Sequence, residues 1–312
     1  MPPRGEALTR EQVDLIRVWI DGGAQWPESS AASAGPTTTG MVVSQVDRNF
    51  WSFRPLRKVT PPKVQDEEWG RNPIDRLIRH EQEVRGLSPA PPAEARTLVR
   101  RIYFDLIGLP PELKGTGGRY HESVLGVELD LRTRRLDPGE YDRLVDRLLA
   151  SPRHGERWAR HWLDIARYAD SDGQEGDADR PNAYRFRDFV IRSFNEDRPY
   201  DEFVRWQIAG DEIAPDQPDA IAATGFLVAG NSTELNVAME EEKLRNRANE
   251  LDDMVSTTGQ ALLGLTVACA RCHDHKYDPI PTRDYYRLMR IFNGGDRKDV
   301  PLVPPSEVRK HK

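Results

Sequence analysis

The sequence lacks an apolar run of the roughly 18 residues that a membrane-spanning helix requires. Its first ten residues, MPPRGEALTR, lack the apolar core of a signal peptide. Positive charge is not in excess either, because the formal net charge is -6 and acidic residues are interleaved with Lys and Arg. We therefore expect no membrane span in this chain and no nucleic-acid partner. The length of 312 residues allows one large domain or two ordinary ones.

Cysteine is scarce, and both cysteines of the chain lie in one short stretch, CARCHDHKYDPI. Cys269 and Cys272 are separated by two residues, and His273 follows directly. This CxxCH pattern is the attachment motif of c-type haem. Two thiols add across the haem vinyl groups, and the adjacent imidazole ligates the iron. The motif predicts bound haem c, although no spacing in the sequence identifies a distal ligand.

Two other uses of this stretch remain open. Cys269, Cys272, His273 and His275 offer four ligands within seven residues, and zinc accepts sets of two Cys and two His. Adjacent ligands strain a tetrahedral site, however, and His275 enters only if the metal is not haem iron. The cysteines could instead form a disulfide, structural or redox-active, or remain free thiols.

Helical periodicity dominates the chain, and no run of residues alternates as a convincing strand would. We therefore predict a mostly α fold, an irregular multi-helix domain with long loops. Residues 113–135, with three glycines and mixed charges, are predicted to be irregular. The predicted helices cover residues 9–20, 72–86, 92–107, 138–150, 153–169, 182–196, 200–210, 218–229, 240–268 and 282–292.

Composition also suggests domain limits. Residues 29–49 begin with SSAASAGPTTTG, a stretch of small residues typical of a linker. Residues 1–28 hold one amphipathic helix whose apolar face needs a partner, so we expect them to be the end of a separate domain. The main domain covers residues 50–295, and residues 296–312 form a tail or a linker toward a further domain.

Three long segments carry a resemblance to a known family. They are ERWARHWLDIARYADSDG, YRFRDFVIRSFNEDRPYDEFVRWQIAGDEI and LGLTVACARCHDHKYDPIPTRDYYRLMRIFNG. Together they resemble the planctomycete cytochrome c-associated domain, a PSCyt-type domain of unknown function, over roughly residues 50–295. MPP followed by LTREQVDLIRVWIDGGAQWP resembles the C-terminal tail of a planctomycete cytochrome c domain. That resemblance implies that Met1 is the distal haem ligand of the preceding domain.

These patterns together predict a haem c-binding domain of a multidomain protein, acting in electron transfer or redox catalysis. Covalent haem attachment and the resemblance imply an extracytoplasmic or periplasmic location. The expected partner is a redox protein, or the cytochrome c domain of the same full-length protein. Because haem c is attached after export and no signal peptide is seen, we expect the natural chain to begin further upstream.

An acidic stretch between two helices supports a different function. Five carboxylates lie between Asp170 and Asp179, and Asp170, Asp172 and Asp177 are candidate ligands for a cation such as calcium. The spacing does not match an EF-hand loop. The alternative function is therefore a hydrolase-like or carbohydrate-associated domain, in a polysaccharide context, with this loop as its site and the cysteines as a disulfide or structural metal site.

Overall fold

The computed structural model describes residues 9–22, 40–111, 113–114, 119–122, 127–130, 137–173, 177–230, 239–295 and 297–302. Met1, most of the predicted linker and the last ten residues lie outside these ranges. The chain divides into two units, Met1–Val42 and Val43–Lys312. Helices account for most of the described residues, which confirms the mostly α prediction. No helix in the described part of the chain is long and apolar enough to cross a bilayer.

The first unit contains one described helix, α1 (Arg10–Asp21), close to its predicted limits. The Thr9 hydroxyl accepts the backbone N–H of Gln12, and the Gln12 side chain accepts the N–H of Thr9. This reciprocal capping box fixes where the helix begins. Every residue of α1 is exposed, including its apolar ones.

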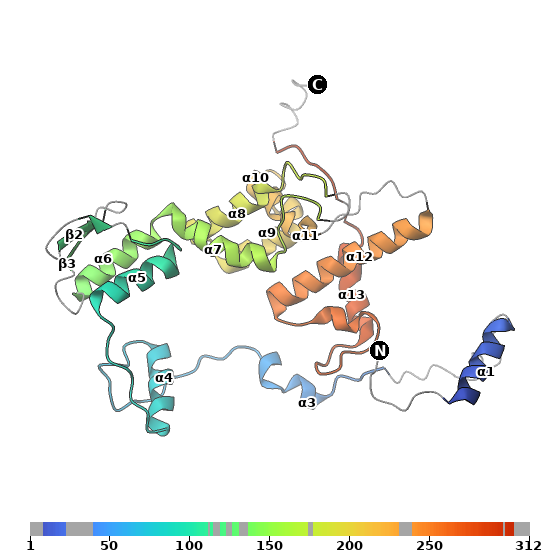
Figure 1. Ribbon diagram of the computed structural model, residues 1–312, viewed down its shortest axis with the longest axis horizontal. Coiled ribbons are helices and arrows are strands. Elements are labelled where there is room, and N and C mark those ends of the chain that lie inside the picture. Colours follow the sequence, from blue (N-terminus) through green and yellow to red (C-terminus); the bar gives the residue numbers. More distant parts are fainter. Residues whose placement is uncertain are drawn as a thin grey trace, which may run out of the picture. The chain divides into compact units, whose positions relative to one another are not determined.

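The second unit begins with two short helical segments and then follows the predicted succession of helices (Figure 1). Helices α4 and α6 have proline at the first or second position. Proline favours a helix start because a backbone N–H in the first turn would have no intrahelical partner, so its loss costs nothing there. The elements are α3 (Gln45–Arg48), η1 (Trp51–Phe53), α4 (Pro73–Val84), α5 (Ala95–Leu106), α6 (Pro138–Leu149), α7 (Pro152–Ile165), α8 (Tyr184–Asn195), α9 (Tyr200–Ile213), α10 (Pro218–Ala223), α11 (Gly225–Val228), α12 (Glu240–Thr258), η2 (Gly259–Leu263), η3 (Val267–Arg271) and α13 (Thr282–Phe292).

A small antiparallel sheet lies between α5 and α6. Strands β1 (Leu113–Lys114), β2 (Arg119–Glu122) and β3 (Val127–Asp130) pair in the order β1-β2-β3. The prediction that residues 113–135 are irregular was therefore wrong for these strands. Each strand has at most four residues, too short for alternation to be visible in the sequence, and cross-strand backbone hydrogen bonds define the sheet.

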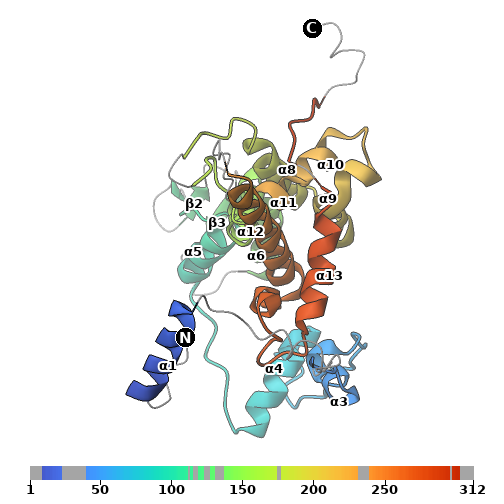
Figure 2. The ribbon, with the colours of Figure 1, turned by 90° about the vertical axis from the view of Figure 1, so that its right-hand side faces the viewer.

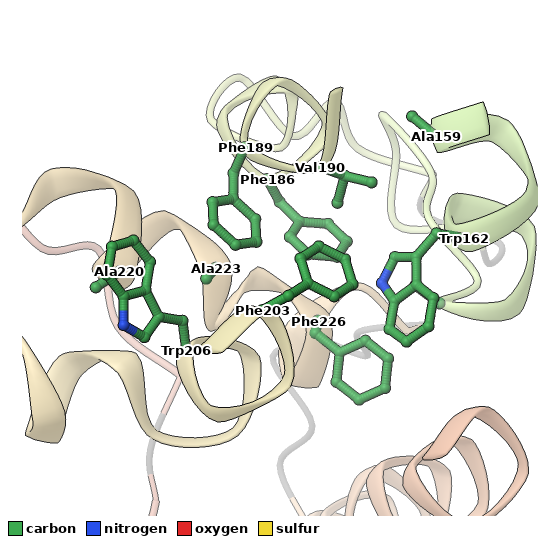
Figure 3. Close-up of a cluster of buried hydrophobic side chains, with 11 residues drawn as sticks. Ala159, Trp162, Phe186, Phe189, Val190, Phe203, Trp206, Ala220, Ala223 and Phe226 are labelled. Carbon is green, nitrogen blue, oxygen red and sulfur yellow. The ribbon is translucent and has the colours of Figure 1, made fainter. Parts of the chain in front are cut away.

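The largest core is aromatic and lies among α7 to α11 (Figure 3). Trp162 of α7 meets Phe203 of α9 edge to face with ring centroids 4.9 Å apart, and Phe189 of α8 stacks on Phe203 at 5.7 Å. The buried Nε1–H of Trp162 donates to Gln207 Oε1 at 2.6 Å. Trp162 thus serves packing, and its indole N–H has a buried hydrogen-bond acceptor.

Two smaller cores of buried residues lie apart from this aromatic core. One joins α5 to α6 through Val99, Ile102 and Leu144 among others. The other joins α12, η3 and α13, and α12 lies beside α13 in both ribbon views (Figure 2). Its buried members are Leu251, Met254, Val255, Val267, Ala270, Tyr285 and Phe292.

The segment before the cysteine motif is not the single long helix predicted over residues 240–268. Helix α12 ends at Thr258, and one π-helical turn, η2, follows it. Gly264 then adopts φ +65, a left-handed conformation that glycine accepts without steric cost and that ends the helix. The chain turns there, and the short 3-10 helix η3 carries the motif.

Candidate cysteine–histidine site

The two cysteines lie in η3 and at the residue directly after it. A 3-10 helix has three residues per turn, so side chains at positions i and i+3 eclipse each other. Cys269 lies within η3 and Cys272 is its C-terminal cap, which gives them that spacing. Both are exposed and both are free thiols. Ala270, between them, is fully buried in the core of α12 and α13, so the motif has one inner and one outer side.

Arg271, also between the cysteines, fixes the motif to α12. Its Nη1 donates to Asp252 Oδ2 at 2.8 Å and its Nη2 donates to Asn249 Oδ1 at 3.0 Å. The backbone oxygen of Arg271 accepts the phenol of Tyr286 of α13 at 3.1 Å. The backbone that carries the thiols is therefore bound to both neighbouring helices.

Asp252 makes a second contact that strengthens this anchor. Its Oδ1 accepts the hydroxyl of Tyr285 at 2.5 Å. Burial and this hydrogen bond raise the pKa of the Tyr285 phenol far above its ordinary value. One carboxylate thus joins the motif to the fully buried aromatic ring of α13.

His273 is exposed and is held by one ring nitrogen only. Its Nδ1 lies 2.8 Å from the backbone oxygen of Asp274, and a carbonyl can only accept, so Nδ1 carries the proton. The Nε2 atom of that tautomer keeps its lone pair. Metal-ligating histidines commonly have this arrangement, with the second nitrogen donating to a backbone carbonyl or carboxylate.

His275 differs from His273 in every one of these respects. Its side chain is only 5% exposed. Its Nδ1 accepts backbone N–H groups from Tyr277 at 3.2 Å and Asp278 at 2.8 Å, and its Nε2 lies 3.0 Å from Thr266 Oγ1. Both ring nitrogens are therefore occupied by protein groups, which disfavours the assignment of His275 as a metal ligand.

The donors of this stretch do not converge on one point. Among the residues that the structure describes, no group of three or more His, Cys, Asp or Glu side chains is placed to hold a metal ion. A bare zinc ion requires such a group. Attachment of haem makes a different demand, since two thiols bind at separate vinyl groups and one imidazole binds the iron.

Comparison with known proteins assigns a family. The family PSCyt2, described as protein of unknown function (DUF1549), matches residues 73–297. The chain belongs to the PSCyt2 family. The match spans α4 to α13 and includes the cysteine motif, so this motif lies inside the PSCyt2 domain. No curated protein and no solved structure matches the chain.

The acidic loop of the PSCyt2 domain is closed by backbone pairing between Ser171 and Asp179. Its three candidate ligands face separate partners. Asp170 accepts the hydroxyl of Tyr168, Asp172 pairs with Arg180 at 2.6 Å, and Asp177 accepts the N–H of Gly173 at 2.9 Å. The described carboxylates thus do not gather around a common point, and a cation or acid–base role for them stays a prediction.

Two arginines near this loop could offset its negative charge, but only Arg180 pairs with one of its carboxylates. Arg180 does pair with Asp172, and its two terminal nitrogens also donate to the backbone oxygens of Ala229 and Gly230. Arg167 instead pairs with Asp253 of α12 at 2.6 Å. Arg180 therefore joins the loop to the residues that follow α11, and Arg167 joins the segment after α7 to α12, which are structural roles.

The motif is visible in the sequence, but the residues that hold it are not. Asp252 contacts Arg271 of the motif and also Tyr285, and Thr266 contacts His275 in the loop after the motif. The only signal for Asp252 was an acid on the inner side of α12. Its partner Arg271 lies 19 residues further along the chain, a distance that helical periodicity cannot bridge.

Proposed function

We propose that the PSCyt2 domain binds haem c at Cys269, Cys272 and His273 and serves in electron transfer or redox catalysis. The observation that carries this proposal is the joint presentation of two exposed thiols and one exposed imidazole with its Nε2 atom unoccupied. The neighbouring residues Ala270 and Arg271 are bound inward, so only the three haem-binding side chains are left outward.

The residues fit the chemistry of haem attachment. Cys269 and Cys272 would provide the two thioether bonds, and His273 would bind the iron through Nε2. The carbonyl of Asp274 holds the Nδ1 proton, which orients the ring and raises its basicity as a ligand. When bound, haem would supply one-electron transfer at its iron, with a potential that depends on its axial ligands and surroundings.

A bare metal ion is the less favoured occupant. Zinc would need three or four convergent donors, and His275, the fourth candidate, has both ring nitrogens hydrogen-bonded. The haem proposal needs only the three outward side chains. It also accounts for the order of the residues, since an imidazole must follow the second thiol directly.

The wider setting belongs to the same proposal. We place the domain outside the cytoplasm, because covalent haem attachment usually takes place there. Residues 1–28 resemble the tail of a cytochrome c domain, so electrons would pass between that domain, or a separate redox partner, and the haem at Cys269 and Cys272. A planctomycete source fits the resemblance of both segments.

Expression together with a haem c maturation system tests this function. The expected product is red, shows a Soret absorption band, and keeps the added mass of one haem after denaturation. A Cys269→Ala, Cys272→Ala double variant is expected to be colourless and of unmodified mass, while a His161→Ala variant on the outer side of α7 stays red. A colourless wild-type protein of unmodified mass would overturn the proposal, and bound zinc in that protein would support the metal alternative.

A further inference from the structure

Both ring nitrogens of His275 are hydrogen-bonded, although His275 is not one of the three residues proposed to bind haem. Its ring is buried, and it contacts protein groups on both sides. On one side, Nδ1 accepts the N–H groups of Tyr277 and Asp278. On the other, Nε2 meets the hydroxyl of Thr266 at 3.0 Å.

These partners determine the tautomer. Backbone N–H groups can only donate, so Nδ1 must carry a lone pair, and Nε2 then carries the proton and donates to Thr266 Oγ1. Asp278 Oδ2 also lies 3.6 Å from Nδ1, a distance at which a charged histidine would form an ion pair. Because Nδ1 already accepts two N–H groups, this contact is not an ion pair.

The ring closes the motif segment into a loop. Thr266 is the N-terminal cap of η3, and its backbone oxygen accepts the N–H of Cys269 at 3.1 Å. At the other end, the backbone N–H of His275 donates to Ile280 at 2.9 Å. One imidazole therefore links the residue that starts the cysteine turn to the loop that follows His273.

Asp274 lies between the two histidines, and both its backbone oxygen and its side chain accept hydrogen bonds. Its backbone oxygen accepts Nδ1–H of His273, and its Oδ1 accepts the N–H of Thr282 at the start of α13 at 2.8 Å. The Asp274 carbonyl and the N–H of His275 belong to one planar peptide group, so the direction of this carbonyl also depends on how His275 is held. That direction in turn sets the orientation of the His273 ring.

We infer that His275 is a positioning residue of the haem site, which clamps the loop from Thr266 to Asp278 so that the thiols and His273 are presented together. This inference rests on the proposed haem function. His275 acts through Thr266 and through the backbone of Asp274, and it does not bind the iron. Loss of an outer hydrogen-bond partner of a metal-ligating histidine typically lowers metal affinity about 10- to 100-fold.

Three variants separate the two sides of the clamp. His275→Asn keeps an acceptor close to the position of Nδ1 but loses the link to Thr266. Thr266→Val removes the same link from the other side while keeping the shape of the side chain. His275→Leu removes both functions. His161→Asn, an exposed histidine in ring contact with Trp158 on α7, is the matched control.

The first measurement uses the apoprotein and needs no haem. Amide hydrogen exchange at Tyr277 and Asp278 is expected to be about tenfold faster in His275→Leu than in the wild type, because one hydrogen-bond acceptor is lost. His275→Asn is expected to restore most of that protection. Thr266→Val and His161→Asn are expected to leave exchange at these two amides within about twofold. Unchanged exchange in His275→Leu would overturn the clamp.

The second measurement follows haem attachment during maturation. The fraction of protein that carries haem, read by intact mass, is expected to fall about tenfold in His275→Leu, with smaller and similar losses in His275→Asn and Thr266→Val. The Soret band of the remaining holoprotein is expected to shift in His275→Leu only. Wild-type haem content and spectrum in folded His275→Leu would overturn the positioning role. If the wild type itself binds no haem, the proposed function fails, while amide exchange still decides whether the clamp exists.

Discussion

Arg271 Nη1 donates to Asp252 Oδ2 at 2.8 Å, and this contact joins Arg271, which directly precedes Cys272, to helix α12. The other carboxylate oxygen accepts the phenol of Tyr285, so three elements meet at one acid. The side chains of both Arg271 and Asp252 are at least two-thirds buried, with 33% and 24% exposed, which limits screening by water.

Asp252→Asn is therefore expected to lower the free energy of unfolding by about 1–3 kcal/mol, since it leaves the guanidinium of Arg271 without its charged partner. Urea unfolding of the apoprotein measures the effect. The control is Asp284→Asn, which removes an exposed ion pair with Arg287 on α13 and should change stability by less than about 0.5 kcal/mol. Equal effects of the two variants would contradict a special role for Asp252.

Tyr285 is expected to make the stability of the fold depend on pH in the alkaline range. Burial, followed by the hydrogen bond to Asp252, raises the pKa of this phenol above its ordinary value of about 10. A group whose pKa is raised by folding stabilises the fold fully below its unfolded pKa. This contribution is thus present below about pH 10 and is lost as pH rises above it.

Absorbance of the phenolate tests this expectation. The absorbance should show a late phase, above the ordinary phenol pKa of about 10, that includes Tyr285. Tyr285→Phe should reduce the late phase, and the stability of this variant should decline less steeply with pH above about 10 than that of the wild type. A late phase of unchanged size in Tyr285→Phe would show that the pKa of this phenol is not raised.

The sequence predicted the helices well because their ends carry local signals. Thr9 with Gln12, and the prolines that begin α4 and α6, mark starts that depend on neighbours within four residues. The break after Thr258 is not visible in the sequence because ALLGLTVACA is apolar apart from Thr266, and its single glycine is tolerated within many helices. The turn at Gly264 allows Val267 and Ala270 to be buried against α12 and α13, and this contact between distant residues has no local signal.

The candidate site was predictable in its reactive residues and not in their supports. CxxCH is a local pattern, so Cys269, Cys272 and His273 could be chosen from the sequence. His275 was also visible there, but its burial and its bond to Thr266 follow from how the chain folds back on itself. Asp252 depends on packing between distant helices, for which one sequence holds no direct signal.

Trp162 tests the aromatic core that supports the rest of the domain. Its indole N–H donates to Gln207 Oε1 at 2.6 Å, and Gln207 is only 1% exposed. Trp162→Phe removes ring volume and leaves that buried oxygen without its donor, so the free energy of unfolding should fall by about 2–4 kcal/mol. Trp158→Phe, one helical turn earlier and 38% exposed, should cost less than about 1 kcal/mol. Similar losses from both tryptophans in urea unfolding would contradict the assignment of Trp162 as the buried anchor.

Cys269 and Cys272 are expected to contribute little to the stability of the fold and to supply both thioether bonds to haem. Both thiols are free and exposed, so either single alanine variant should keep the free energy of unfolding of the apoprotein within about 0.5 kcal/mol of the wild type. Ala270→Ser is the contrasting control, because it places a hydroxyl in a fully buried position between the two cysteines and should lower the free energy of unfolding by about 1–3 kcal/mol.

After maturation, each single cysteine variant should retain haem through one thioether, and the double variant should retain none on denaturation. A loss above about 2 kcal/mol in both single variants would instead indicate that the cysteines stabilise the fold as a disulfide.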